Sequence, residues 1–468
     1  MASKAERAAV TYSREIERLT ASVRFGLGTN AADLEAMGAD PRGWLADQIE
    51  TSIPVPSSAV PPSAGQEAET YYRLREYERS VSDGPDAENA RLSSQQSLLR
   101  LRDILSEATL DTLSTAVETQ HPFRERLIRF WSNHFSVQPK NWLAKIALPY
   151  FAGTAISPFV AAPFEEMLLS VCRHPAMQIY LDSGRSTGPN SKVGLKRGLG
   201  LNENLAREIL ELHTLGVGGG YSQEDVIELA AALTGWTSGK PKDEETAWRF
   251  IFQPARHEPG GATLLSKTYP DKGEATAEHI LRDLARHPST AHHIATKLAR
   301  HFIDDDPPDS AVDKLERRWL ETQGDLGEVS HTLVTLDEAR ASLFSKLKQP
   351  GDLVVSSLRA LDMEMTPQLA KLAARHQAAM GQPLLRPPGP QGWYDTVHDW
   401  SDPGSLSRRV DWGVALAAQT SDSTNARAAM ERNFGSLVDR DNRLAIERAS
   451  TRQEAAAILI ASPLFQRR

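Results

Sequence analysis

The chain has 468 residues, of which 40% are hydrophobic and 24% charged, and this composition excludes wholesale disorder, collagen and a multi-span membrane protein. Its formal net charge of -8 provides no overall positive field, so we expect no nucleic-acid partner. Cys172 is the single cysteine, which excludes an intramolecular disulfide and any thiolate-based zinc or iron–sulfur site.

Residues 1–51 are predicted to form an N-terminal helical pair, with helices over about 5–25 and 31–50, because their apolar residues recur at helical spacing. The first residues, MASKAERAAVTYSREIERL, have no apolar core and no small-residue cleavage site, so no secretory signal is expected. We therefore expect a cytoplasmic location. Four prolines in SIPVPSSAVPPSAGQ then predict a loop or linker over residues 52–66.

Residues 67–463 are predicted to form one main helical domain, because nearly every long segment has helical period and is rich in good helix formers. Helices at about 203–215 and 223–235 should form a central hairpin across GVGGGYS. The uncharged stretch IALPYFAGTAISPFVAAPF contains prolines and a glycine that would leave backbone groups unpaired in lipid, so no transmembrane segment is expected. The predicted fold is mainly α: a large multi-helical single unit with that hairpin and long irregular loops.

The most polar motif is NENLAREILELHTLG, over residues 202–216. On a helical wheel Asn204, Arg207, Glu208 and Glu211 share one face, opposite an apolar face. One interpretation is a capped, salt-bridged helix in which Arg207 pairs with Glu211. In the other, the grouped carboxylates hold a divalent cation, or one of them acts as a general base. The spacing matches no standard zinc or calcium motif.

Histidines and aromatic residues provide further candidates. His134 lies on an apolar stripe of FRERLIRFWSNHF, where it is either a hydrogen-bonded core residue or a desolvated base. His257 lies in an irregular loop, either solvated or turned into a pocket. The line of His293, Lys297 and His301 favours a solvated basic helix face over an anion site. The loop GWYDTVHDW either covers the helical core or walls a ligand groove.

Five segments carry a resemblance to a known family: RERLIRFWSNHFSV, HPAMQIYLD, NENLAREILELHTLGVGGGYSQEDVIELAAALTGW, RHFIDDDPP and MGQPLLRPPGPQGWYDTVHDW. In this order they resemble the bacterial family catalogued as domain of unknown function 1800. The resemblance covers nearly the whole chain and implies a mostly helical fold. It also implies a partner, because members are often encoded beside a sulfatase-like family that is often exported; export with that partner to the periplasm is the alternative location.

The same resemblance implies a set of polar motif positions. They are Asn133, His134, Asn202, Glu203, Asn204, Arg207, Glu208, Glu211, His213 and His257. The chain departs from the family pattern in the loop after TGW, where Glu258 replaces an expected aspartate and the spacing to Lys267 is stretched. That departure puts any role of the loop in doubt.

We conclude from the sequence that an enzyme of hydrolase or metal-assisted type is the leading hypothesis. Its predicted catalytic residues are Glu208, Glu211, His134, His257 and Arg207. A supporting polar cluster would consist of Asn133, Asn202, Glu203, Asn204 and His213. A divalent metal is the one cofactor that these side chains suggest. The alternative hypothesis is a non-catalytic helical scaffold or assembly partner of the sulfatase-like protein.

Overall fold

The computed structural model describes residues 13–50, 54, 59–81, 84–239, 243, 245–421 and 423–468. The fold is mainly α, as predicted, and the strands of the described ranges form two short antiparallel pairs. Among these residues no helix is both long and apolar enough to cross a membrane. Many helices begin at a proline, whose fixed φ and missing N–H suit the first helical position; examples are Pro62, Pro122, Pro288 and Pro350.

The N-terminal region differs in detail from the predicted pair of helices. Residues 5–12 of the first predicted helix lie outside the described residues; residues 13–19 are helical and continue into the π-helical segment η1 (Thr20–Phe25). The second predicted helix is two helices, α2 (Ala31–Met37) and α3 (Pro41–Glu50). Gly38, with a φ of 53°, separates them.

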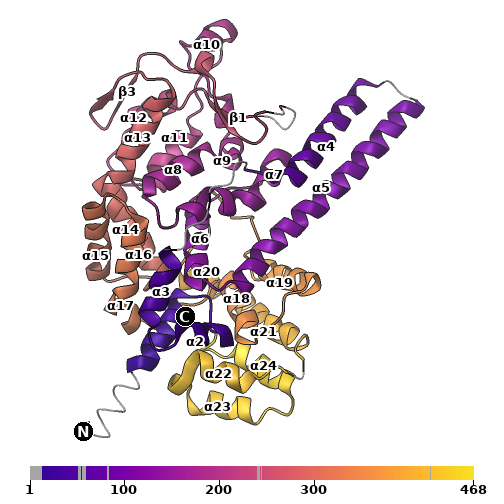
Figure 1. Ribbon diagram of the computed structural model, residues 1–468, viewed down its shortest axis with the longest axis vertical. Helices are drawn as coiled ribbons and strands as arrows, with labels where there is room; N and C mark the ends of the chain where they lie inside the picture. The colour runs from indigo at the N-terminus through magenta and orange to yellow at the C-terminus, as the bar shows by residue number, and fades with distance from the viewer. Residues whose placement is uncertain are drawn as a thin grey trace.

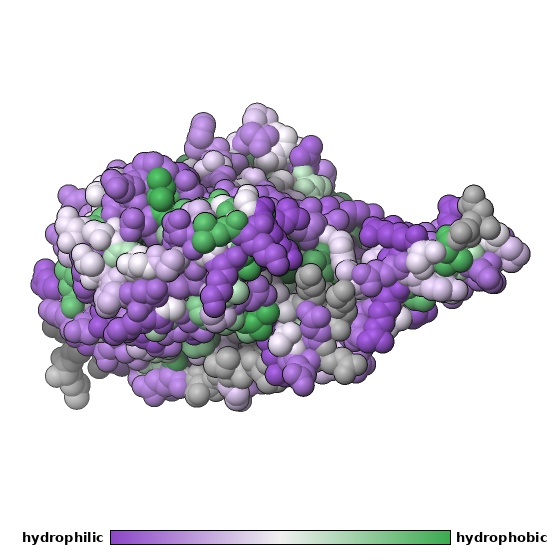
Figure 2. All heavy atoms as spheres, turned by 90° about the horizontal axis from the view of Figure 1, so that it is seen from above, coloured by the Kyte–Doolittle hydropathy of each residue, from purple (hydrophilic) through white to green (hydrophobic). Residues whose placement is uncertain are grey.

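The predicted loop of residues 52–66 is described only in part, since residues 51–53 and 55–58 lie outside the described ranges. Helix α4 (Pro62–Ser80) begins inside it and packs along α5 (Pro85–Glu118). Together α4 and α5 form an antiparallel hairpin that projects from the body (Figure 1). Figure 2 shows the hairpin tapering away from a face covered mainly by hydrophilic side chains. The hairpin is attached through α5, which contacts α7, α18 and α19, and through α4, whose Tyr71 ring packs against Trp142 of α7.

Helix α6 (Pro122–His134) lies at the centre of the body, and most of its side chains are buried. Two π-helical segments, η1 and η2 (Ala152–Ile156), pack against it. A third, η5 (Ile209–His213), follows α11 (Asn204–Glu208) and accepts a hydrogen bond from α6. Single π turns are rare and occur often at functional sites. Helix α7 (Trp142–Phe151) precedes η2 directly.

The remaining elements complete the helical body. In chain order they are η3 (Ser157–Phe159), α8 (Phe164–Arg173), α9 (Pro175–Tyr180), η4 (Ser183–Arg185), α10 (Lys192–Arg197), α12 (Gln223–Ala232), β1 (Trp236–Ser238), β2 (Phe250–Phe252), η6 (Pro254–Arg256), β3 (Ala262–Leu264), β4 (Lys267–Tyr269), α13 (Glu274–Arg286), α14 (Pro288–Phe302), α15 (Asp309–Thr322), α16 (Leu326–Thr335), α17 (Asp337–Ala341), α18 (Pro350–Ala360), α19 (Pro367–Ala379), α20 (Val397–Trp400), α21 (Pro403–Ala417), α22 (Ala426–Phe434), η7 (Gly435–Leu437), α23 (Arg440–Glu447) and α24 (Arg452–Ala461).

The predicted central hairpin is present, since α11 with η5 packs against α12 across the glycine turn. Strand β1 pairs with β2 and β3 with β4. Apolar side chains form two clusters: one is built mainly from residues 21–339 and includes much of α6, and the other mainly from residues 353–465. Side chains of α6 therefore lie near the boundary between two hydrophobic cores, a usual place for a ligand site.

Candidate functional site

Polar side chains of α11 form hydrogen bonds with neighbouring side chains on the protein surface. Arg207 donates a hydrogen bond to Glu203 at 2.9 Å and another to Gln223 of α12 at 2.8 Å. Arg207 does not pair with Glu211 as expected. It pairs with Glu203, which lies one turn earlier. The side chains of Arg207 and Glu203 are 41% and 37% exposed, so this ion pair contributes little stability.

The two asparagines of the motif hold the turn between α9 and α11. Asn202 accepts a hydrogen bond from the backbone N–H of Asn204 at 2.9 Å and donates to the carbonyl oxygen of Asp182 at 3.3 Å. Asn204 donates to the carbonyl oxygen of Leu181 at 3.5 Å. Asp182 has a left-handed φ of 54°, so these amide contacts fix a turn that the backbone alone would not favour.

Glu208 and Glu211 form a pair of like charges at the junction of α11 and η5. Burial and the neighbouring Glu211 raise the pKa of Glu208 above its ordinary value, while Lys140 and Arg207 act in the opposite direction. Within the described part of the chain, no group of three or more His, Cys, Asp or Glu side chains is placed to hold a metal ion. The pair on its own offers at most two carboxylates to a cation.

His134 has both ring nitrogens engaged inside the protein. Its Nε2 donates to the carbonyl oxygen of His213 at 3.2 Å, and its Nδ1 accepts from Nζ of Lys297 at 3.0 Å. His293 donates in the same way to the carbonyl oxygen of Leu212, at 3.2 Å. The two imidazoles thus satisfy carbonyl groups at the end of η5, which the π turn leaves without helical partners. Burial and the charge of Lys297 lower the pKa of His134 well below 6.5.

The prediction that His293, Lys297 and His301 form a solvated face is wrong. Helix α14 turns this face into the body, where His301 is 9% exposed and the pKa of Lys297 falls to about 8 because the ammonium group is buried. The polar line looked like a surface because it matches the i, i+4 spacing of exposed charged helices. Its apolar flanks, Ala291 to Phe302, gave the opposite signal.

His257 lies apart from both the α11 surface and the buried histidines. Its Nδ1 donates to the carbonyl oxygen of Thr234 at 3.0 Å, and its Nε2 is 3.4 Å from a carboxylate oxygen of Asp271. Among the described residues, no hydrogen bond or ion pair joins His257 to Glu208, Glu211 or His134. The predicted catalytic residues are therefore distributed over the α11 surface, the buried histidines and this loop, and they do not share one cavity.

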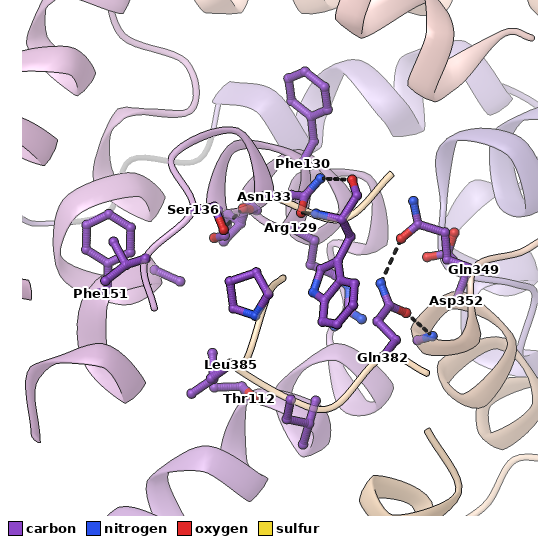
Figure 3. Close-up of a pocket in the computed structure, with 18 of the residues that line it drawn as sticks. Thr112, Arg129, Phe130, Asn133, Ser136, Phe151, Gln349, Asp352, Gln382 and Leu385 are labelled. Atoms are coloured by element: carbon purple, nitrogen blue, oxygen red, sulfur yellow. Dashed lines mark hydrogen bonds between the residues drawn. The ribbon is translucent and has the colours of Figure 1, made fainter. Parts of the chain in front are cut away.

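A cavity of about 200 Å³ lies beside α6, between α7, α18, α19 and the segment after α19 (Figure 3). Three of its lining residues, Glu125, Arg129 and Asn133, recur every four residues along α6 and so share a helix face. Asn133, a predicted supporting residue, accepts from the backbone N–H of Trp393 at 2.7 Å and donates to its carbonyl oxygen at 2.9 Å. This clamp sets Trp393 in the wall of the cavity, as one interpretation of GWYDTVHDW proposed.

A chain of amides and one His–Asp pair stiffens another wall. Gln382 accepts from the backbone N–H of Gly351 at 2.7 Å and donates to Gln349 at 2.8 Å (Figure 3). Gln349 donates in turn to Oδ1 of Asp395 at 3.0 Å. The other carboxylate oxygen of Asp395 is 2.5 Å from Nδ1 of His301. Each amide is used at both ends, so its orientation is fixed.

The cavity contains two carboxyl groups in contrasting surroundings. Asp352 pairs with Arg126 at 3.1 Å, and the guanidinium groups around it hold its pKa well below the usual range despite burial. Glu125 has no hydrogen-bond or ion-pair partner among the described residues, and burial raises its pKa to about 7. Arg129, one turn further along α6, is also without a bonded partner in the described ranges. One acid is thus ionised and the other is poised near neutrality.

Sequence reasoning missed Glu125, Arg129 and Asp352. The spacing of Glu125, Arg129 and Asn133 in FRERLIRFWSNHF was a usable signal, because it places three polar side chains on one face of an otherwise buried helix. No local signal could have found Asp352, whose segment is more than two hundred residues away from α6 and meets it only in the folded chain.

Comparison with known proteins supports the family resemblance. A family model described as "Protein of unknown function (DUF1800)" matches residues 20–467. The search of curated proteins and the search of solved structures each found no match. The family match spans both hydrophobic clusters, the cavity and the α11 motif. The chain therefore belongs to the DUF1800 family.

Proposed function

We propose that the protein is a hydrolase that acts on a small molecule in the α6 cavity, with Glu125 as the general acid–base residue and Arg129 as the holder of an anionic substrate group. The observation that carries the proposal is the pair of unbonded side chains, Glu125 and Arg129, on the cavity face of α6. Both side chains are partly buried at the edge of a partly apolar cavity, where they are placed to pair with the polar groups of a ligand.

The chemistry needs both forms of one carboxyl group. Glu125 as a carboxylate takes a proton from a water molecule, and the resulting hydroxide adds to the electrophilic carbon of the substrate. The bond to the leaving group then breaks, and Glu125 returns the proton to the leaving atom. A pKa of about 7 suits this cycle, because both forms of Glu125 are populated near neutral pH.

Glu125 replaces Glu208 as our leading candidate for the base. Glu208 also has a raised pKa, but its immediate neighbour is a second carboxylate and it does not line the α6 cavity. His134, with both nitrogens engaged, acts in this proposal as a positioning residue that ties α6 to η5. His301 and Asp395 hold the amide chain of the opposite wall.

The test is turnover of a panel of small chromogenic esters and amides by the native protein, Glu125→Gln and Glu208→Gln. The proposal expects hydrolysis that Glu125→Gln abolishes and Glu208→Gln leaves nearly unchanged. Hydrolysis that survives Glu125→Gln, or none by the native protein on any member of the panel, would overturn it.

The alternative, a scaffold for a sulfatase-like partner, is favoured by one feature, the projecting α4–α5 hairpin. Three large hydrophobic side chains are exposed there: Tyr77, Leu92 and Leu99. In this alternative the two proteins would travel together to the periplasm, whereas the hydrolase proposal leaves the chain in the cytoplasm. Co-elution with a sulfatase-like protein from the same cells, lost in a Leu92→Glu/Leu99→Glu variant, would support it; separate elution would count against it.

A further inference from the structure

One buried amide in the cavity has no partner. Gln377 of α19 is 3% exposed and lines the cavity, yet its side chain makes no hydrogen bond among the described residues. The other two glutamines of the wall, Gln349 and Gln382, are bonded at both ends. An unpaired buried amide is unfavourable, so Gln377 is placed to bond a molecule that enters the cavity.

Gln377 and Arg129 both approach Gly351. A β carbon placed on Gly351 would lie 3.0 Å from Nη2 of Arg129, 3.1 Å from Oε1 of Gln382 and 3.3 Å from Nε2 of Gln377. Any side chain at this position would therefore crowd the space between the two polar groups. The glycine keeps a guanidinium and a free amide within reach of one small ligand.

The charges around this space select the ligand. Arg129 offers the planar pair of donors that suits a carboxylate. The second cation, Arg126, is already paired with Asp352, and Glu125 adds a further acid, so the cavity can neutralise one negative charge but not two. Phe130, Phe151 and Leu385 supply an apolar wall. A monoanion with an apolar body fits this combination.

We infer that the cavity binds small N-acylated amino acids: Arg129 pairs with the carboxylate, Gln377 pairs with the neighbouring amide, and the side chain packs against the apolar wall. An amide offers one donor and one acceptor, which match the acceptor and donor of Gln377. In such a molecule one carbon separates the carboxylate from the amide, which suits two protein groups that flank a single glycine. The inference names the substrate class of the proposed hydrolase site and rests on that proposal only for turnover.

The test is calorimetric titration of the full chain with three ligands: N-acetyl-leucine, its C-terminal amide, and 4-methylpentanoate. The native protein should bind N-acetyl-leucine most tightly, with at least a tenfold loss when the carboxylate or the amide is missing. Arg129→Gln should weaken binding of N-acetyl-leucine about tenfold or more. Gln377→Leu should weaken N-acetyl-leucine but leave 4-methylpentanoate nearly unchanged.

The surface variant Arg207→Gln is the matched control for Arg129→Gln and should bind as the native protein does. Failure of N-acetyl-leucine to bind saturably at millimolar concentration would overturn the inference, as would equal affinities in the native protein, Arg129→Gln and Gln377→Leu. Binding without turnover in the native protein would refute the hydrolase proposal and leave the ligand class standing.

Discussion

The α11 motif and the α6 cavity contain the same types of side chain in opposite settings. On α11, asparagine, glutamate and arginine side chains mostly bond one another on a half-exposed surface, as Arg207 does with Glu203 and Gln223. In the cavity, Glu125 and Arg129 make no hydrogen bond or ion pair with the described residues, whereas Asp352 is paired with Arg126. A high density of polar residues in the sequence thus indicated a hydrogen-bonded surface network. Polar groups without partners in a cavity instead indicate a candidate site.

The largest expected effect is on turnover, which should depend on the α6 cavity and not on the α11 motif. Glu125→Gln should lower hydrolysis of any substrate of the panel by about 100-fold to 10,000-fold, because it removes the group that carries the proton. Glu208→Gln should change the rate by less than about twofold, since its carboxylate lies outside the cavity. Initial rates at saturating substrate measure both. A larger loss in Glu208→Gln than in Glu125→Gln would reverse the assignment.

The next largest effect is on the free energy of unfolding, which should differ between a cavity variant and an α11 variant. Arg126→Met should lower the free energy of unfolding by about 1–3 kcal/mol, because it removes the hydrogen-bonded partner of the buried Asp352 and leaves only Arg468, 3.3 Å from the same oxygen, as an ion-pair partner. Arg207→Met removes a half-exposed ion pair and should cost less than about 1 kcal/mol. Urea denaturation of the two variants and the native protein gives the difference. Equal losses of unfolding free energy would mean that the Arg126–Asp352 pair contributes no more stability than the surface pair of Arg207 and Glu203.

A third effect concerns pH and Glu125. Below pH 4.5 this carboxyl is protonated in both states; between pH 4.5 and about 7 only the unfolded state loses the proton, so the native protein loses stability as pH rises. Above about 7 the loss is constant, up to about 3 kcal/mol. Glu125→Gln lacks this term, so its stability relative to the native protein should rise over that window. Parallel pH profiles of the two proteins in urea would contradict the raised pKa.

The smallest effect concerns the histidines next to η5. His134 keeps its neutral form in the folded protein, so stability is full above pH 6.5 and falls below it, by about 1.4 kcal/mol for each pH unit. His134→Asn should make the decline below pH 6.5 shallower by that amount. Replacement of the exposed His398 by asparagine serves as the control and should leave the slope unchanged. An unchanged slope in His134→Asn would show that His134 titrates in the folded state.

Much of the fold could be predicted because it rests on local patterns. Helix α12 begins where Ser222 and Asp225 form a capping box, and the apolar stripe of α6 is buried as its period requires. The π segments could not be predicted in this way. Each of them widens a helix by a register change that tertiary packing selects, and propensity does not record it.

The candidate site was less predictable than the fold, for a physical reason. Gln349, Gln377 and Gln382 approach α6 only after α18 and α19 pack, and a glutamine carries no local signal of its partner. We predicted catalytic residues in the α11 motif because its charged residues are neighbours in the sequence. Asn133 was a motif position that the family resemblance implied, and nothing in the sequence indicated that its partner is Trp393 of a distant loop.

The central claim is that Glu125 is an unpaired acid in a binding cavity, and its ionisation tests that claim most directly. Infrared difference spectra of the native protein against Glu125→Gln, recorded across pH, isolate the carboxyl band of this one residue. We predict a carboxyl that loses its proton with a midpoint at about pH 7 and that shifts when Arg129 is replaced by glutamine. A midpoint near 4.5, unaffected by Arg129→Gln, would contradict the account.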